Sequence, residues 1–432
     1  MKKILVMLVV GLMLVLALVG CTDPTATNVP SNTPGGSTEA PTTEAPSATP
    51  TTPAEEVIAT LPPATQKPEA PGVDENLTYK FDLDEMTMPI WQSNTIYNEC
   101  ITFHKDEAGN ITAKLLFKPI QVISVRDNSL KIELKEGVHY KFDEKDPQTL
   151  IWLEGDDNFV IPYWNPGDLS SPHQDNCGTS GMGGAIGNIM YCVGEWLYSK
   201  QLAITYTYDL NDNTMPHAEY AGAYLPKTIA KLQNKEKLSI CIYGDSIFTG
   251  CDSSSTYGRE PKIPTFFKLL QTKLADLYDH EEIKLSNPSV GGWQADDGIE
   301  NVGTKVARRK PDLVILGFGM NDSDKSGTLE AKKIQQIMDA ILKENPDCEF
   351  IVVSTFQPTP AWTGNIGSHA AGFKTLEKVG VATMDMFELH QYILARKYYQ
   401  DTTGNNINHP NDYLARIYAM QLLTMLYDYN AQ

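Results

Sequence analysis

A serine near the middle of the chain and a histidine near its end stand in contexts that favour nucleophilic chemistry. Ser246 follows the apolar run 238–243 and a Gly-Asp pair, and His409 precedes a proline. A serine at the end of a buried strand lies at the carboxyl edge of a sheet, where open α/β folds bind their ligands. An imidazole that accepts the hydroxyl proton makes serine a nucleophile. The two residues therefore predict acyl transfer, with Ser246 as the nucleophile and His409 as the base and then the acid.

Two further loops carry candidate donors for the oxyanion that forms when a serine attacks a carbonyl. Gly292 and Asn321 each follow an apolar run that is predicted to be a strand. Acyl transfer needs N–H groups directed at the developing negative charge. We expect the backbone amides of Ser246 and Gly292 and the side-chain amide of Asn321 to supply them, with Gly291 as the alternative to Gly292. Trp293 is either a platform for a sugar ring or a core aromatic residue under the loop.

The segment from residue 237 onward has the pattern of alternating strands and helices. Apolar runs predict strands at 238–243, 283–290, 313–318, 350–356 and 381–387, and apolar residues spaced by three and four predict helices at 266–278 and 331–343. Strands that are apolar throughout and end in polar loops indicate a parallel sheet covered on both faces. The predicted fold class is therefore α/β, a three-layer α/β/α sandwich whose loops meet at one edge of the sheet. This catalytic domain is predicted to cover 226–432.

Residues 76–225 are predicted to form a separate all-β accessory domain. Short alternating or aromatic-rich runs at 78–81, 112–117, 150–153 and 202–208 are separated by turn residues, and no long helical period appears. This pattern is typical of an antiparallel β-sandwich or jelly roll. Such domains bind carbohydrate in some proteins and serve only as packing partners in others, and the sequence leaves both roles open.

The N-terminus has the layout of an export signal. Residues 1–20 contain two early lysines and then an uncharged apolar run, and they end before Cys21. This ending resembles the bacterial lipobox, which implies lipid attachment at Cys21 and loss of the leader. An uncleaved anchor helix is the alternative, because the apolar run is just long enough to span a bilayer. Both interpretations predict an extracellular protein anchored to the cell membrane.

Residues 21–75 are predicted to be a disordered Thr/Pro-rich linker. Thr, Pro, Ala, Ser and Glu dominate this segment, and almost no aromatic or large aliphatic residue is present to build a core. Such a chain stays semi-extended. The linker would therefore hold the catalytic body away from the membrane surface.

Charge and cysteine content narrow the range of partners. Loss of the leader with its two lysines changes the formal net charge from −19 to −21. This negative net charge disfavours binding to nucleic acid or to anionic lipid headgroups, and it favours a neutral substrate. Six cysteines follow Cys21, at positions 100, 177, 192, 241, 251 and 348. Their spacing has no zinc-type pattern, and a single bridge between Cys177 and Cys192 is compatible with it.

The order and spacing of Ser246, Gly292, Asn321 and His409 resemble the four blocks of the SGNH (GDSL) hydrolase superfamily. The resemblance covers the C-terminal half of the chain. It implies a flavodoxin-like sheet and ester hydrolysis through an acyl-enzyme intermediate. It also implies that no metal ion or organic cofactor takes part.

One position departs from the family pattern. The superfamily usually has an aspartate three residues before the histidine, where it orients the ring, but residue 406 is asparagine. We therefore expect the side-chain oxygen of Asn406 or the backbone carbonyl of Ile407 to accept the imidazole N–H. A neutral acceptor stabilises an imidazolium less than a carboxylate does, so other contacts must hold the ring. The alternative is a carboxylate brought close by the fold: Asp385, Asp401 or Asp412.

In this missing aspartate and in the predicted jelly roll, the chain resembles carbohydrate esterase family 2. Some members of that family orient the histidine with a main-chain carbonyl. By this resemblance the expected substrate is an O-acetylated polysaccharide or oligosaccharide of xylan or mannan type. Two other functions stay open. A lipid or phospholipid esterase would use the same serine and histidine but needs an apolar lid or acyl channel. A non-catalytic surface protein would bind glycan through its β domain. The sequence predicts no oligomeric state.

Four other polar residues are expected to have structural or minor roles. Asp245 should brace the nucleophile loop, and Asp322 should be a structural carboxylate. His390, on an amphipathic stretch, should be solvated or capped. His369 lies in a loop after the fourth predicted strand, near the edge of the site, where it either touches substrate or has no role.

Overall fold

The computed structural model describes residues 82–153, 157–163, 177–180, 189–192, 195–322, 326–359 and 366–431. The predicted leader, Cys21, the linker and the run 78–81 lie outside these ranges and stay predictions. Within the described ranges, no helix combines the length and the apolar character that a membrane crossing requires.

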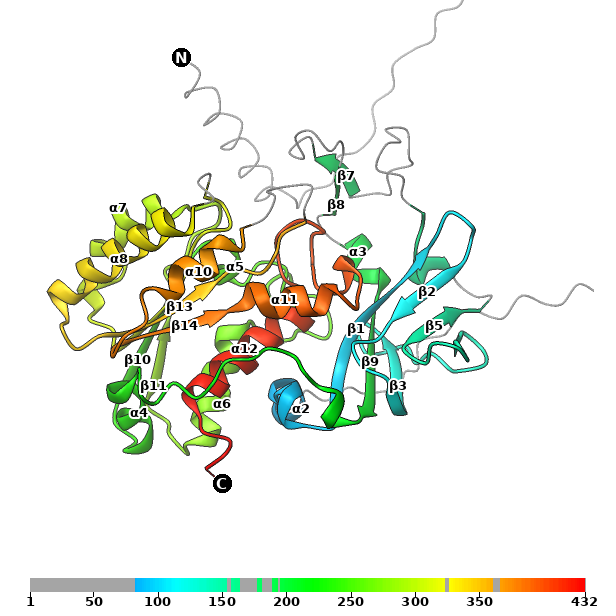
Figure 1. The fold of residues 1–432 in the computed structure, drawn as a ribbon, viewed down its shortest axis with the longest axis horizontal. Coiled ribbons are helices and arrows are strands. Elements are labelled where there is room, and N and C mark those ends of the chain that lie inside the picture. The colour runs from blue at the N-terminus through cyan, green and yellow to red at the C-terminus, as the bar shows by residue number, and fades with distance from the viewer. Residues whose placement is uncertain are drawn as a thin grey trace, which may run out of the picture. The chain divides into compact units, whose positions relative to one another are not determined.

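A five-stranded parallel sheet forms the centre of the C-terminal half, as the apolar runs predicted (Figure 1). Its strands are β10 (Leu238–Gly244), β11 (Ile283–Ser286), β12 (Leu313–Gly317), β13 (Glu349–Ser354) and β14 (Val381–Asp385). Their order in the sheet is β11-β10-β12-β13-β14, which is the flavodoxin-like order. The order reverses at β10, because β11 lies on one side of it and β12 on the other. Open sheets bind ligands at the carboxyl end of such a switch point.

Three of the predicted strands extended two or more residues into the following loops. The run 381–387, for example, ends as a strand at Asp385, because the Asp385 carboxylate accepts a hydrogen bond from the backbone of Glu388 and begins helix α11 (Met386–Leu394). An aspartate at this position is a strong helix N-cap. The strands predicted at 283–290 and 350–356 likewise end at Ser286 and Ser354.

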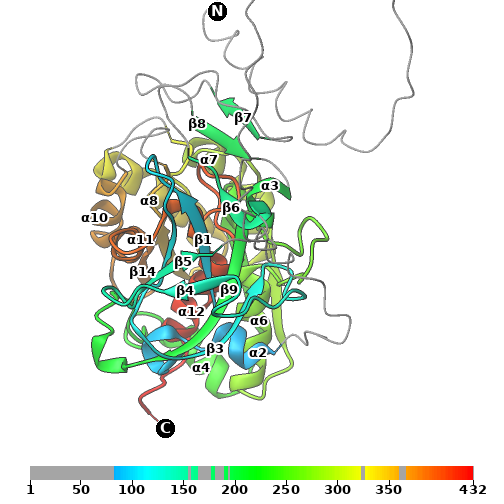
Figure 2. The ribbon, with the colours of Figure 1, turned by 90° about the vertical axis from the view of Figure 1, so that its right-hand side faces the viewer.

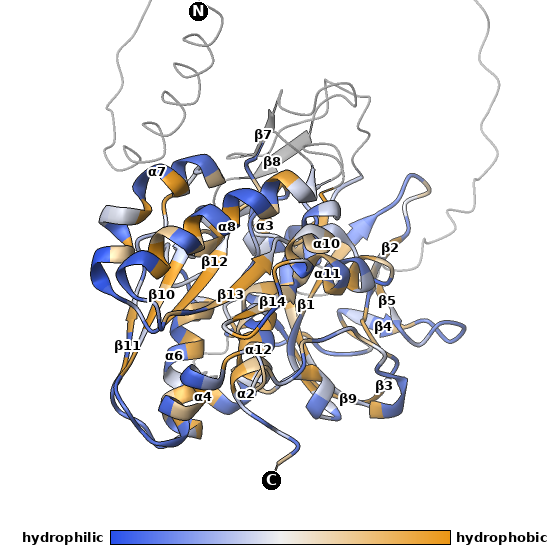
Figure 3. Ribbon diagram, turned by 60° about the vertical axis from the view of Figure 1, so that its left-hand side comes forward, coloured by the Kyte–Doolittle hydropathy of each residue, from blue (hydrophilic) through white to orange (hydrophobic). Residues whose placement is uncertain are grey.

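Helices cover both faces of the parallel sheet and complete the three layers. One face carries α4 (Pro226–Gln233), α6 (Phe266–Leu277), α11 and α12 (Asp412–Leu426), and the other carries α7 (Ala295–Lys305), α8 (Gly327–Glu344) and α10 (Ser368–Lys374). The buried cluster under α4, α6, α11 and α12 is called the first core, and the cluster under α7, α8 and α10 is called the second core. Ile240 and Ile242 face the first core, whereas Cys241 and Tyr243 face the second core. Because both faces are buried, the three central strands β10, β12 and β13 are mainly apolar, as the hydropathy colours of Figure 3 show.

The N-terminal half contains a mainly antiparallel sheet. Its strands are β1 (Thr95–Lys105), β2 (Ile111–Lys114), β3 (Pro119–Asp127), β4 (Tyr140–Phe142), β5 (Thr149–Trp152), β6 (Val160–Ile161) and β9 (Gln201–Tyr208). The path is β3-β9-β1-β2-β5-β4, and β6 pairs parallel with β1. The runs 112–117, 150–153 and 202–208 are thus confirmed as strands, although β2 ends at Lys114. The jelly-roll topology stays a prediction.

Short elements connect these parts of the chain. They are α2 (Leu83–Thr87), α3 (Glu195–Lys200) and α5 (Ser246–Thr249), together with the 3₁₀ turns η1 (Ile90–Gln92), η2 (Asp157–Phe159), η4 (Leu210–Asp212), η5 (Ala307–Arg309) and η6 (Tyr399–Asp401). A hairpin of β7 (Cys177–Ser180) and β8 (Ile189–Cys192) sets Cys177 opposite Cys192 in its backbone register. The disulfide between them stays a prediction.

One hydrophobic core runs through both sheets, and α12 lies at its centre. Apolar residues of β1 and β9, including Ile101 and Ile204, belong to the same buried cluster as Leu414 and Tyr418 of α12. Every residue of α12 is buried. Figure 1 places this helix between the parallel sheet and the antiparallel sheet, and Figure 2 shows it behind the strands of the antiparallel sheet. The two halves are therefore packed together through a shared interior that crosses the boundary predicted at residue 226.

Candidate active site

The nucleophile candidate Ser246 is the first residue of α5, directly after β10. Asp245 is the N-cap of this one-turn helix and accepts a hydrogen bond from the backbone of Ile247 at 2.9 Å. A side chain at Gly244 would stand 2.3 Å from the carbonyl oxygen of Gly317, so only glycine allows β10 and β12 to meet this closely. The tight turn places Ser246 at the switch point of the sheet.

The fold brings His409 to this serine across 163 residues of sequence. The distance from His409 Nε2 to Ser246 Oγ is 2.9 Å, which is a hydrogen bond. His409 lies in the loop between η6 and α12, and its side chain is 18% exposed. The imidazole can therefore be reached by a substrate. The serine and the histidine stand together as the sequence predicted.

Asp252 supplies the acceptor on the other side of the ring. The distance from His409 Nδ1 to Asp252 Oδ2 is 2.6 Å, and the carboxylate is 6% exposed. Because an ionised carboxylate only accepts hydrogen bonds, Nδ1 carries the proton and Nε2 is left to accept one from Ser246. Ser246, His409 and Asp252 thus have the arrangement of a serine-hydrolase triad.

The prediction that Asn406 or Ile407 accepts the imidazole N–H of His409 is wrong. The side-chain oxygen of Asn406 accepts a hydrogen bond from Gln400 at 2.9 Å, and the carbonyl of Ile407 accepts one from the hydroxyl of Tyr399 at 2.6 Å. The acid comes instead from the loop that follows the nucleophile. Gly250, with a left-handed φ of 84°, ends α5 after one turn and sends the chain back toward His409.

Two features hold Asp252 against the histidine loop. Asp252 itself has a φ of 63°, a conformation that aspartate tolerates better than most residues do. A side chain at Gly404 would stand 2.4 Å from the Cβ of Asp252, so glycine lets the two loops touch. The only sequence signal for Asp252 was an acid two residues past a glycine that could end the nucleophile helix.

The three carboxylates considered as alternatives are engaged elsewhere. Asp385 caps α11, and Asp401 accepts a hydrogen bond from Thr102 of the antiparallel sheet. Asp412 accepts a hydrogen bond from the backbone of Ser254 at 2.8 Å. Asp412 therefore supports the loop that carries Asp252, and it does not itself contact the ring.

The two predicted oxyanion loops lie at the same edge of the sheet as Ser246. A side chain at Gly291 would be 3.8 Å from the Cβ of Ser246, and Gly292 has a φ of 78°. The side-chain amide of Asn321 donates to the carbonyl of Trp293 at 3.1 Å, which joins the loop after β12 to the loop after β11. This amide carries a second N–H for an oxyanion. Ser246 and Asn321 stay the expected donors, together with Gly292 or its alternative Gly291.

The indole of Trp293 packs against the second core. Its ring stands at 85° to that of Tyr243, with 6.3 Å between centroids, and the Nζ atom of Lys305 lies 5.1 Å from its centroid. These contacts cover part of the ring, and the side chain is partly buried. They favour the interpretation of Trp293 as a packing residue over that of a sugar platform.

A buried charged cluster supports the oxyanion loops from behind. The Asp322 carboxylate accepts from the backbone of Ala295 at 3.2 Å and from Lys333 Nζ at 3.0 Å. Asp322 is therefore structural, as expected. Burial, and then the nearby charge of Asp322, raise the pKa of Glu330 to about 8, so Glu330 is neutral at pH 7. Burial likewise raises the pKa of Asp245 to about 7.

Two other histidines, His390, which was predicted to be solvated or capped, and His369, which was predicted to touch substrate or to have no role, are both buried. His390 is fully buried, bonds to Thr402 Oγ1 at 2.9 Å, and has its pKa lowered to about 3 by burial. His369 is 1% exposed and packs beside Gly319, where an added side chain would meet its ring at 2.9 Å. His390 is thus a core residue, and His369 supports the turn before Asn321 from within.

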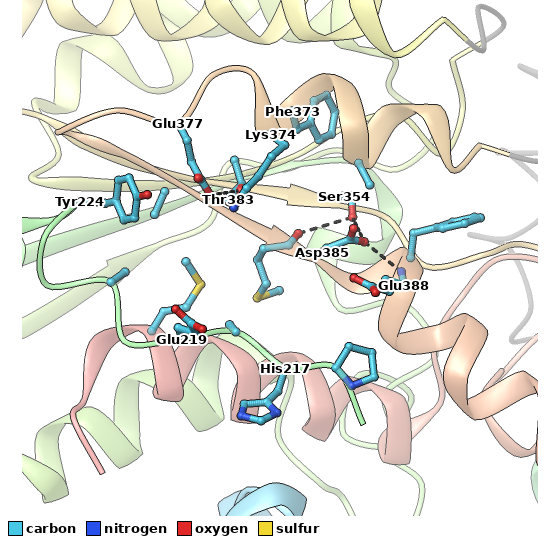
Figure 4. A pocket seen from close by; sticks show the side chains of 18 of the residues that line it. His217, Glu219, Tyr224, Ser354, Phe373, Lys374, Glu377, Thr383, Asp385 and Glu388 are labelled. Atoms are coloured by element: carbon cyan, nitrogen blue, oxygen red, sulfur yellow. Dashed lines mark hydrogen bonds and ion pairs between the residues drawn. The ribbon is translucent and has the colours of Figure 1, made fainter. Parts of the chain in front are cut away.

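A cavity of about 660 Å³ opens elsewhere, along the free edge of β14 (Figure 4). Glu377 in its wall accepts hydrogen bonds from Lys374 and Thr383, and Asp385 accepts one from Ser354. The described residues that line it do not include any member of the triad. Within the described part of the chain, no cluster of three or more His, Cys, Asp or Glu side chains could hold a metal ion.

Residues 242–417 match the GDSL-like Lipase/Acylhydrolase family. This segment contains the whole triad, and the family that it matches is one of lipases and acylhydrolases. The triad has the geometry with which a serine attacks an acyl carbonyl. A search of curated proteins found no match.

Several solved structures are similar to the chain at low identity. A two-domain esterase (CEX) active on acetylated mannans, co-crystallized with mannopentaose, has 17% identity and a TM-score of 0.37, with coverage of 48% of this chain and 53% of that chain. The acetyl xylan esterase AlAXEase has 18% identity and a TM-score of 0.35, with coverage of 43% and 98%. The lipase Lip_vut3 from a goat rumen metagenome has 13% identity and a TM-score of 0.35, with coverage of 43% and 95%. The match spans about half the length of the two-domain esterase.

The triad predicts that Asp252→Asn lowers kcat for p-nitrophenyl acetate by about 10²- to 10⁴-fold, because an amide neither enforces the tautomer nor stabilises the imidazolium. Asn406→Ala is the matched control and should retain activity within about tenfold, since it leaves the carboxylate in place. Equal losses in the two variants would show that Asp252 does not orient the ring.

The raised pKa of Glu330 predicts a pH-dependent stability. A carboxyl whose pKa is about 8 in the folded state and ordinary in the unfolded state stabilises the fold at low pH, and this contribution is lost as the pH rises from about 4.5 to 8. Glu330→Gln removes the titrating group and keeps its shape. The melting temperature of the variant minus that of the wild type should therefore increase by a few degrees as the pH is raised from 5 to 8.5. A constant difference across this range would contradict the assignment.

Proposed function

We propose that this protein is a serine esterase that removes O-acetyl groups from a xylan- or mannan-type polysaccharide or oligosaccharide through an acyl-enzyme. The observation that carries the proposal is the continuous hydrogen-bonded chain from Ser246 Oγ through the His409 ring to the Asp252 carboxylate. This chain activates a hydroxyl for attack on an ester carbonyl.

The first half-reaction transfers the acetyl group to the enzyme. Ser246 Oγ attacks the acetyl carbonyl and passes its proton to Nε2 of His409. The carboxylate of Asp252 stabilises the resulting imidazolium. The oxyanion accepts hydrogen bonds from the backbones of Ser246 and Gly292 and from the side chain of Asn321. When the tetrahedral intermediate collapses, the sugar oxygen leaves with the proton of His409.

The second half-reaction releases acetate. A water molecule takes the place of the sugar and gives its proton to Nε2 of His409 as it attacks the acyl carbonyl. Ser246 then leaves as the hydroxyl, with the proton returned from the imidazolium. The ester and one water molecule supply every atom that the two steps need beyond the chain.

Three features favour a carbohydrate ester over a lipid ester. The net charge of −19 disfavours anionic headgroups. The chain resembles carbohydrate esterase family 2 in its SGNH blocks and its N-terminal β domain. In addition, the loop that carries Asp252 continues to Tyr257, which is 47% exposed and has the guanidinium of Arg259 4.8 Å from its ring centroid. The guanidinium covers one face of this ring, and the exposed part of the side chain can contact a sugar.

Release of acetate tests this proposal. The enzyme should liberate acetate from acetylated xylan or acetylated mannan, and it should prefer p-nitrophenyl acetate to esters of ten or more carbons. Ser246→Ala is the control and should abolish turnover. A preference for long acyl chains would support a lipid esterase instead, and no turnover of any ester would support a non-catalytic glycan-binding protein.

We further propose that the protein is held at the outer face of the membrane by a lipid on Cys21 and by the linker 21–75. The mass of the protein purified from the membrane fraction of the producing cells tests the anchor: the wild type should begin at a lipid-modified Cys21, and Cys21→Ser should keep residues 1–20 without lipid. A wild-type chain that keeps residues 1–20 would favour the uncleaved anchor helix. The mass measurement is independent of esterase activity, so it tests the anchor alone.

A further inference from the structure

The loop that carries His409 lies against the end of the antiparallel sheet. Strands β1 and β9 pair there with Thr102 opposite Gln201, and both side chains are buried. The 3₁₀ turn η6 and the start of the loop pack on this end of β1 (Figure 1). The sheet predicted to be an accessory domain therefore contacts the catalytic loop directly.

Gln201 makes the most specific of these contacts. Its side-chain Nε2 donates to the carbonyl of Gln400 at 2.9 Å and to the carbonyl of Thr403 at 2.7 Å. Both hydrogens of a buried amide are thus used to hold the backbone within η6 and just after it. Gln201 is 1% exposed, so water cannot replace these bonds without entering the core.

The bonds made by Thr403 lead on to His409. The hydroxyl of Thr403 donates to the backbone carbonyl of His409 at 2.9 Å, and the backbone N–H of Gly404 donates to the same carbonyl at 3.0 Å. Thr403 also forms an isolated antiparallel bridge with Pro410. A single residue therefore separates the amide of Gln201 from the backbone of the catalytic histidine.

Buried polar groups of β1 anchor both ends of the same loop. Before the loop, Lys397 pairs with Glu99 at 2.6 Å, and both side chains are fully buried. After the loop, the side-chain amide of Asn411 donates to Cys100 Sγ at 3.3 Å and to the carbonyl of Asp401 at 3.0 Å. The backbone of His409 is thus positioned from the antiparallel sheet, whereas Ser246 and Asp252 are positioned from the parallel sheet.

We propose that Gln201 is a positioning residue for His409, through which the antiparallel sheet sets the distance from the imidazole to Ser246. The inference rests on the proposed function, because it assigns a role in that reaction. It makes the N-terminal sheet part of the catalytic apparatus rather than a separable glycan-binding module.

The chain offers a matched pair of variants. Gln148 also donates from Nε2 to two backbone carbonyls, those of Leu115 at 3.4 Å and Leu116 at 3.2 Å, but these lie in the segment between β2 and β3 of the antiparallel half. Gln201→Met and Gln148→Met each remove one such side-chain amide and keep similar volume. Both should lower the melting temperature, and only the first should affect the histidine loop.

We expect Gln201→Met to lower kcat for p-nitrophenyl acetate by roughly 10- to 100-fold with KM within about twofold, because a displaced base slows the chemical step and not binding. Gln148→Met should leave both constants within about twofold of the wild type. Within the loop, Thr403→Val should reproduce the kcat loss and Thr403→Ser, which keeps the hydroxyl, should restore it. Gln201→Met combined with Thr403→Val should lose less than the product of the two single losses, because both act through one path.

Amide hydrogen exchange gives a readout that does not need turnover. Exchange in peptides covering 401–411 should accelerate in Gln201→Met and remain unchanged in Gln148→Met. Equal kcat in the two variants, or unchanged exchange in 401–411, would overturn the positioning role while the wild-type esterase activity still stands. If the wild type turns over no ester, the proposed function fails, and the exchange comparison alone then decides whether Gln201 holds the loop.

Discussion

The hydrogen bond between His409 and the carboxylate of Asp252 determines what the rest of the site can do. It assigns the proton to Nδ1, which leaves Nε2 to receive the proton of Ser246. It also puts a negative charge beside the imidazolium that acyl transfer creates. Each feature that holds Asp252, including Gly250 at the end of α5 and Asp412 behind the loop, therefore acts on the chemistry through this one contact.

The triad is assembled from two sheets, and burial holds these sheets together. The nucleophile and the acid follow β10 of the parallel sheet, whereas the histidine loop packs against β1 and β9 of the antiparallel sheet. Helix α12 is buried on every side between them, and the fully buried pair of Lys397 and Glu99 crosses the same boundary. Breaking one partner of such a pair leaves an uncompensated buried charge, which is strongly unfavourable. The relative position of the sheets is thus well defined.

The features predicted correctly are those that a local pattern determines. Apolar runs identified the parallel strands, and their ends placed Ser246, Gly292 and Asn321 at one edge. Asp252 was missed because its role depends on the left-handed turns at Gly250 and at Asp252 itself, which no periodicity reveals. The environment of His390 was missed for a related reason: its helix looks amphipathic, but η6 and the loop to α12 cover the polar side.

The hydrogen-bonded imidazole proton offers the most direct measurement. In a proton NMR spectrum recorded in water, an Nδ1 proton shared with a carboxylate appears far downfield of the backbone amides. We predict one such resonance in the wild type, assigned by its loss in His409→Ala, that also disappears or moves strongly upfield in Asp252→Asn and persists in Asn406→Ala. A resonance that survives unchanged in Asp252→Asn would show that another group accepts the proton and would contradict the triad.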